Sequence, residues 1–222
     1  MNNKFTALAG TIFALFMLVG CATNKKDYDY TAFEESKPTS ILVLLPTNHS
    51  NEINASYGVL SQVTLPLAEA GYYVFPVNLT NEVFKQNGFT IADDIHSVTL
   101  TKLQQIFNPD AVLYLKIINY GTNYQIIQSD TRVTLEAKLV DVQTSKVIWT
   151  GTASASSTEN QQSSNSLIST LLSAAITQIS DTVRDHSVTI SGLAAARLFT
   201  PHPIKYNGIL YGPYANTTKL DQ

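Results

Sequence analysis

Cysteine and charge are both scarce in this sequence, and each shortage excludes a class of protein. Cys21 is the only cysteine in 222 residues, so no disulfide bond can form within the chain. Charged residues make up 14% of the chain, and 14 lysines and arginines stand against 17 acidic residues, which gives a formal net charge of −3. A basic face of the kind that binds nucleic acid is therefore not expected.

Common catalytic and metal-binding patterns are also missing. The nucleophile pattern Gly-x-Ser-x-Gly, the zinc pattern His-Glu-x-x-His and a glycine-rich phosphate loop do not occur. The four histidines stand apart from one another, at His49, His96, His186 and His202. We therefore predict that the protein is not an enzyme and that it holds no cofactor and no metal ion.

The start of the chain has the order of a secretion signal. Lys4 is the only charge in residues 1–20, and an apolar run shorter than the roughly 20 residues of a transmembrane helix follows it. Leu18, Val19, Gly20 and Cys21 resemble the bacterial lipobox, which implies cleavage before the cysteine and lipid, including palmitate, on Cys21. The alternative is a plain secretory signal followed by an incidental cysteine.

The residue after Cys21 bears on the location of the protein. In enterobacterial lipoproteins, which this segment resembles, an aspartate at that position retains the protein at the inner membrane. Ala22 occupies it here, which implies the outer membrane, with the protein facing the periplasm. Residues 21–39 show charges and scattered aromatic residues without a helical or strand period, so we predict a lipidated tether. Residues 40–222 are long enough for a single domain with its own core.

The first half of that domain alternates between strand and helix patterns. The aliphatic run at 41–46 is typical of a strand buried on both faces. Short links between strands and helices imply parallel strands joined by right-handed crossovers. The elements predicted after the first strand are a helix at 54–70 with Gly71 as its C-cap, a strand at 72–77, a short helix at 81–86 and a helix capped by Thr99.

The second half changes to strict alternation. Strands are predicted at 111–121, 132–142 and 146–156; the second has an apolar face from Val133 to Leu139 and a polar face with Thr134, Glu136 and Lys138. Two helices follow, one with an apolar stripe from Leu167 to Val183 and one at 190–199. We predict an α/β (α+β) fold, a two- or three-layer sandwich whose mixed sheet joins parallel crossovers to an antiparallel meander and C-terminal helices.

Several stretches resemble known envelope proteins. The segments LAEAGYYVFPV and LQQIFNPDAVLYLKI are similar to the α/β domain shared by the TolB amino-terminal domain and the CsgG group of lipoproteins. The hairpin LVDVQTSKVIWTG resembles an Asp-x-x-Thr-Gly-x-x-x-Trp pattern of that group at Asp141, Thr144 and Trp149, with Ser145 in place of the usual glycine. With the lipobox and the NGILYGPY tail, the chain resembles a family of bacterial lipoproteins (domain of unknown function 799). The resemblance implies a fold and a location but no reaction.

Several acidic residues, one histidine and the tryptophan have predicted structural roles or are candidate ligands. Asp93, Asp94 and His96 are the best metal candidates, and Asp94 and His96 would lie on the same side only in an extended segment; the alternative is a solvated loop before a helix. Asp110 follows Pro109, so it is expected in a turn where it accepts from nearby backbone amides. Asp141 and Thr144 are predicted turn residues. Trp149 is predicted to pack in the core, on the same strand face as Val147, under the helix with the Leu171–Ile179 stripe.

These expectations lead to one main hypothesis and one alternative. The main hypothesis is a non-catalytic outer-membrane lipoprotein that acts as a periplasmic adaptor or assembly factor, alongside a CsgG-like lipoprotein as the resemblance implies. The alternative is a periplasmic ligand-binding protein or hydrolase that acts on an envelope component. A deep pocket with convergent polar groups would favour the alternative, and a flat surface with an exposed apolar patch would favour the adaptor.

Overall fold

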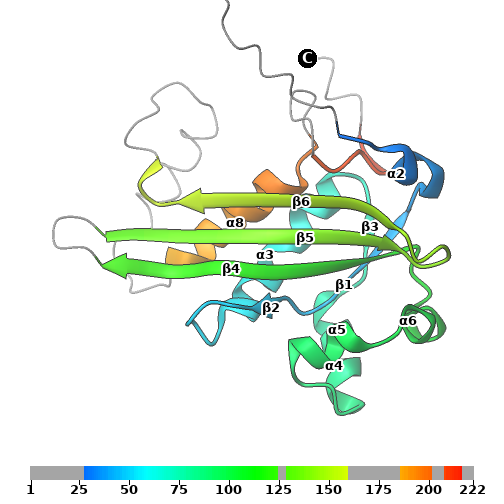
Figure 1. Cartoon of the computed structure of the whole chain (residues 1–222), viewed down its shortest axis with the longest axis horizontal. Helices are drawn as coiled ribbons and strands as arrows, with labels where there is room; N and C mark the ends of the chain where they lie inside the picture. Colours follow the sequence, from blue (N-terminus) through cyan, green and yellow to red (C-terminus); the bar gives the residue numbers. More distant parts are fainter. Residues whose placement is uncertain (1–27, 125–128, 160–185, 202–207, 217–222) are drawn as a thin grey trace, which may run out of the picture.

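A computed structural model describes residues 28–124, 129–159, 186–201 and 208–216, and it builds them around one mixed β-sheet (Figure 1). The strand order is β3-β1-β4-β5-β6, and β2 also pairs with β4. The elements in chain order are α2 (Thr31–Ser36), β1 (Ser40–Val43), β2 (Thr47–Asn48), α3 (Ala55–Glu69), β3 (Tyr73–Val74), α4 (Val77–Gln86), α5 (Ala92–Ser97), α6 (Leu100–Phe107), β4 (Ala111–Tyr124), β5 (Ser129–Asp141), β6 (Val147–Ser156) and α8 (His186–Phe199).

The predicted fold class is confirmed. Strand β1 runs parallel to β3 and β4, and β2 also runs parallel to β4. Strands β4, β5 and β6 then form the antiparallel meander. Within the residues that the structure describes, no helix has both the length and the apolar character needed to cross a membrane.

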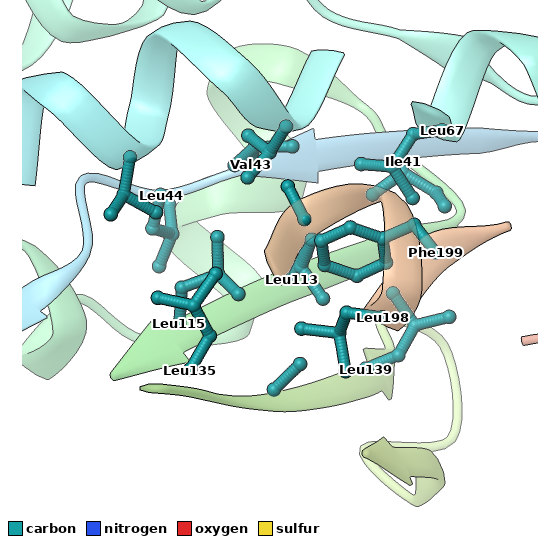
Figure 2. Close-up of a cluster of buried hydrophobic side chains, with 14 of the residues drawn as sticks. Ile41, Val43, Leu44, Leu67, Leu113, Leu115, Leu135, Leu139, Leu198 and Phe199 are labelled. Carbon is teal, nitrogen blue, oxygen red and sulfur yellow. The ribbon is translucent and has the colours of Figure 1, made fainter. Parts of the chain in front are cut away.

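The core lies between the sheet and the helices α3 and α8, which cover the same face (Figure 1). Ile41, Leu42 and Val43 are all buried, as expected for a strand covered on both sides. Figure 2 shows side chains from β1, β4, β5, α3 and α8 meeting in this core, among them Leu113, Leu139 and Phe199. Helices α4, α5 and α6 gather beside β1 and β2, so the described helices leave much of the other face of the meander uncovered (Figure 1).

The segment before β1 departs from the prediction. We expected residues 21–39 to be a tether, but residues 31–36 form α2, and Phe33 is buried against the domain. Tyr28 and Tyr30 bond to Thr150 and Gly208 respectively. Removal of aromatic side chains from water lowers the free energy of the folded state. Tyr28, Tyr30 and Phe33 therefore pack against the sheet and the C-terminal segment. The described part of the predicted tether, residues 28–39, therefore belongs to the folded body.

Several element boundaries also differ from the prediction. The strand predicted at 41–46 ends at Val43, and the helix predicted at 190–199 begins at His186. The strand predicted at 72–77 is only Tyr73–Val74, because Pro76 ends the ladder and serves as the N-cap residue of α4. For the same reason the helix predicted at 81–86 begins earlier, at Val77. Thr99 caps α6 as predicted, accepting a bond from the Lys102 amide. The helix predicted with the Leu167–Val183 stripe lies outside the described residues.

Strand β6 contains a β-bulge that the alternation pattern did not reveal. Leu139 pairs with Trp149 but Val140 pairs with Val147, so Ile148 is the additional residue. Val147 is consequently 49% exposed while Ile148 and Trp149 are both buried. The prediction that Val147 and Trp149 share a face is therefore wrong. The Trp149 ring packs against Phe199 of α8, with centroids 6.0 Å apart, so α8 covers it in the described structure.

Candidate functional site

The predicted hairpin residues form a closed turn between β5 and β6. One carboxylate oxygen of Asp141 accepts bonds from the Thr144 amide at 2.6 Å and from the Thr144 hydroxyl at 2.7 Å. The other oxygen accepts from the Ser36 hydroxyl of α2 at 2.5 Å. Burial favours a higher pKa for Asp141, but these bonds outweigh it and hold the pKa below the usual value. The carboxylate therefore fixes the turn and attaches α2 to it.

Asp110 has a similar structural task at the start of β4. Its Oδ2 accepts from the backbone amides of Thr39 and Ser40, both at 2.9 Å, and from their hydroxyls. These amides lie about 70 residues upstream, whereas we expected partners in the local turn. Burial acts to raise the pKa of Asp110, and the bonds from Thr39 and Ser40 together lower it below its ordinary value. Asp110 thus joins β1 to β4.

The Asp93, Asp94 and His96 segment is helical rather than extended. Two residues apart on α5, Asp94 and His96 point in different directions, so the arrangement required for the metal hypothesis is not formed. The described residues contain no group of three or more histidine, cysteine, aspartate or glutamate side chains placed to hold a metal ion. His96 instead turns toward β4, where its ring meets the Tyr114 ring edge-on at 5.2 Å.

His96 brings α5 to the rim of a groove over the uncovered face of the meander. The groove encloses about 630 Å³. Its floor follows from strand alternation: polar side chains of β4, β5 and β6 point into it, while Leu115 and Ala137 between them are buried. Tyr28 lines the groove on the β6 side, opposite His96. The polar floor residues are Tyr114, Lys116, Glu136, Lys138, Thr150 and Thr152.

The charges of the groove floor are arranged by the strand register. Lys116 lies directly opposite Glu136, and Tyr114 lies opposite Lys138. The Lys138 ammonium sits 5.0 Å from the centre of the Tyr114 ring, a cation–π contact. Among the described residues, no ion pair within 4.0 Å involves Lys116, Glu136 or Lys138. These three charges are therefore available to a bound molecule.

The rim residues are held by specific hydrogen bonds. His96 Nε2 lies 2.9 Å from the Leu45 carbonyl oxygen, and Nε2 carries the proton that it donates. Burial lowers the pKa of His96, although this bond acts in the opposite direction. On the other side the Tyr28 hydroxyl accepts from the Thr150 amide at 2.8 Å. Burial raises the pKa of Tyr114, so its hydroxyl stays protonated.

Most of the groove was not predicted. Strand alternation predicted the polar face with Glu136 and Lys138 but assigned no role to it. Tyr28 was assigned to the tether, and His96 to a possible metal site with Asp94. Only the three-dimensional pairing of β4, β5 and β6 places these side chains in one groove.

Comparison with known proteins places the chain in a family. Residues 28–214 match the family described as "Putative lipoprotein GNA1162-like". The chain belongs to this family. A relative from Neisseria meningitidis serogroup B, "Putative lipoprotein NMB1124/NMB1162", is 47% identical over 201 residues, which cover 90% of this chain and 92% of the relative. The crystal structure of lipoprotein GNA1162 from Neisseria meningitidis shares 48% identity, with a TM-score of 0.54, over 65% of this chain and 100% of that chain.

The comparisons decide part of the predicted identity. Membership of a bacterial lipoprotein family, predicted from the lipobox and the order of the motifs, is confirmed. The likeness to the TolB amino-terminal domain and to the CsgG group stays a prediction. The relatives are named as lipoproteins without a reaction, which is consistent with a protein that is not an enzyme.

Proposed function

We propose that this GNA1162-like lipoprotein is anchored in the outer membrane by lipid on Cys21 and that its domain acts in the periplasm as a non-catalytic adaptor or assembly factor. Family membership supports the lipid anchor, and the Leu18–Cys21 lipobox supplies the attachment point. Ala22 supports the outer-membrane location. A CsgG-like lipoprotein is the proposed companion, on the strength of the sequence resemblance alone.

The observation that carries the adaptor role is the groove over the meander. Small-molecule sites are mostly apolar cavities that enclose most of the ligand. This groove lies on a sheet face instead, and charged and hydroxyl side chains form its floor. Such a surface suits a segment of a larger partner, which contacts the floor and leaves its other side in solvent. The carboxylates of Asp110 and Asp141, which would be candidates for catalysis, bond to the fold itself.

The ligand-binding or hydrolase alternative has one observation in its favour. His96, Tyr114, Glu136 and Lys138 all line the same groove, and titratable groups that converge in a hollow are typical of active sites. His96 is the natural candidate base, because Nε2 donates to the Leu45 carbonyl and the neutral ring then keeps Nδ1 free to accept a proton. A photo-crosslinking residue in place of Glu136, introduced in the living cell, separates the two. An adduct with one envelope polypeptide supports the adaptor, and crosslinking to glycan or small molecules alone supports the alternative.

The anchor is tested by metabolic labelling with a palmitate analogue. Cys21→Ala should abolish labelling and leave the uncleaved precursor, because the sulfur that accepts the lipid is gone. Ala22→Asp is the matched control: it keeps Cys21, so label should be retained while the protein moves to the inner-membrane fraction. Label retained in Cys21→Ala would refute the anchor, and an unmoved Ala22→Asp protein would refute the sorting argument.

A further inference from the structure

Strand β6 forms one edge of the sheet and exposes a long row of backbone groups. It spans Val147–Ser156, and β5 is its one partner among the strands that the structure describes. Long unpaired edges attract other strands, and proteins cover them with side chains or loops. Two side chains do so here. Tyr28 accepts from the Thr150 amide at 2.8 Å, and Arg197 Nη1 donates to the Ser154 carbonyl at 2.7 Å.

These two bonds reveal which way the backbone of Thr152 points. Residues two apart on a strand direct their N–H and C=O groups to the same side. The Thr150 amide and the Ser154 carbonyl both point away from β5, so the Thr152 amide and carbonyl between them do the same. Among the described residues, neither the amide nor the carbonyl of Thr152 forms a hydrogen bond with another element. One residue of the edge is therefore left open between two covered neighbours.

We propose that this open edge at Thr152 takes up an extended segment of a partner polypeptide as an added antiparallel strand. The inference rests on the adaptor function proposed above and names the class of partner. One residue of an antiparallel strand can form two hydrogen bonds to the residue opposite, which is what the Thr152 amide and carbonyl offer. Strand addition of this kind is a common mode of peptide recognition, in which backbone bonds give affinity and alternate side chains give specificity.

The groove determines which side chains the added strand should carry. Thr150 and Thr152 point into the groove beside Lys138 and Glu136 of β5, respectively. A long acidic side chain opposite Thr150 can reach toward Lys138, and a basic one opposite Thr152 can reach toward Glu136. Because the strands run antiparallel, the basic residue comes first in the partner sequence. The charges therefore favour a partner segment with the order basic, any residue, acidic.

The position of Tyr28 limits where such a partner can be. Tyr28 holds the β6 edge and lies seven residues after Cys21 in the sequence. Seven residues span at most about 25 Å when fully extended. With lipid on Cys21, the β6 edge therefore lies within about 25 Å of the anchor point. A partner segment that is itself held at the membrane surface meets this geometry.

Hydrogen exchange measured by NMR on the mature full-length chain in detergent tests the proposal. The probe is a capped heptapeptide, Thr-Val-Lys-Val-Glu-Val-Thr, and the control is the same peptide with lysine and glutamate interchanged. The Thr152 amide should exchange rapidly in the free protein, and saturating probe should slow it by up to about tenfold, the effect of one net hydrogen bond. The interchanged peptide should bind more weakly. Unchanged Thr152 exchange at millimolar probe, or equal binding of both peptides, overturns the proposal.

Two substitutions give opposite expected effects. Thr152→Pro removes the outward amide without breaking a ladder bond to β5, so it should abolish probe binding, while Thr152→Val keeps the amide and should bind as the native chain does. Tyr28→Phe removes the hydroxyl that covers the Thr150 amide, so it should tighten probe binding. If Thr152→Pro does not fold, Tyr28→Phe still decides, and unchanged or weaker binding by it counts against the proposal. Failure here leaves the labelling test of Cys21 unaffected, since that test measures lipid attachment and the binding measurement follows only the β6 edge.

Discussion

Ser145 adopts a backbone conformation that few residues other than glycine and asparagine occupy readily. Its φ is 58°, in the left-handed region, at the position of the β5–β6 turn where related hairpins are expected to have glycine. The departure from the pattern therefore does not change the turn. The Asp141 carboxylate holds Thr144 just before it, and these bonds offset the strain at Ser145.

Ser145→Gly should accordingly stabilise the protein. The left-handed conformation costs a residue with a Cβ about 1–2 kcal/mol, and the greater freedom of glycine in the unfolded chain returns part of that gain. We expect the free energy of unfolding to rise by about 0.5–1 kcal/mol, measured by urea denaturation. Ser145→Ala is the control and should bring no gain, because it keeps the Cβ. A loss of stability in Ser145→Gly would mean that the serine hydroxyl contributes more than the strain costs.

Asp110 shows how far single residues can be interpreted from sequence. Its chemistry was predicted correctly, since it accepts from backbone amides rather than standing as a free acid. Its partners could not be predicted, because Thr39 and Ser40 come within reach only when β1 and β4 pair in parallel. The same limit applies to His96, whose contact with Tyr114 depends on where α5 sits beside β4.

At the scale of elements, periodicity predicted the strands well and the details of their edges poorly. The buried run at 41–46 and the alternation in β5 both reflect the burial of whole faces, which sequence records directly. The bulge at Ile148 breaks the alternation of β6 without any mark in the composition. Likewise, α2 lies before the predicted start of the domain, and it packs there because Phe33 is buried against the domain.

Substitution of Trp149 tests how firmly α8 packs against the sheet. Its side chain is 1% exposed and packs against Phe199, and an added Cβ at Gly151 would lie only 2.5 Å from its ring. Trp149→Ala should lower the free energy of unfolding by roughly 3–5 kcal/mol, because it leaves a cavity between β6 and α8. Guanidinium denaturation of the mature chain measures this effect.

The exposed neighbour Val147 provides the matched control for that substitution. Val147 is 49% exposed on the same strand, so Val147→Ala should change stability by no more than about 0.5 kcal/mol. A cost below about 1 kcal/mol for Trp149→Ala would mean that the contact with α8 is loose in solution. The helix could then separate from β6, and the assignment of the Trp149 ring to the core would be wrong.

At the scale of the whole molecule, the groove combines parts that sequence patterns describe separately. Its floor comes from the meander, one rim from α5 and the other from the segment that follows the anchor. Each part has a recognisable local pattern, but their meeting depends on the strand order β3-β1-β4-β5-β6. The site could therefore be predicted only as separate polar positions, whereas the fold class followed from the order of periodic segments.

The two ends of the described chain are also brought together, by the segment at 208–216. Tyr30 donates to the Gly208 carbonyl, and Tyr72 donates to the Leu210 carbonyl at 2.5 Å. Burial raises the pKa of Tyr72, so its hydroxyl keeps the proton it donates. The Gly212 amide bonds to Ala70, and the Tyr214 amide bonds to Gly71. The 208–216 segment thus connects Tyr30, which follows the anchor in the sequence, to the end of α3.

The 208–216 segment approaches the end of α3 very closely at Gly71, so substitution of this glycine tests the connection. An added Cβ at Gly71 would lie 2.2 Å from the Ala215 backbone nitrogen, and the φ there is +94°. Gly88 has a similar φ of +85° but nothing within 4 Å of an added Cβ. Gly88→Ala should therefore cost only the conformational penalty, about 1–2 kcal/mol. Gly71→Ala adds a steric conflict and should cost about 2–5 kcal/mol, measured by denaturant unfolding.

The difference in stability between the two alanine variants separates the cost of backbone strain from the cost of displacing the 208–216 segment. If the 208–216 segment moves away to relieve the conflict at Gly71, hydrogen exchange at the Gly212 and Tyr214 amides should also rise in Gly71→Ala, because both bonds end at this turn. Gly88→Ala should leave those amides unchanged. Equal costs for the two variants, with both amides still protected, would show that the segment does not press on Gly71. The Gly212 and Tyr214 amide bonds, with the hydroxyls of Tyr30 and Tyr72, would then hold the segment without close packing against Gly71.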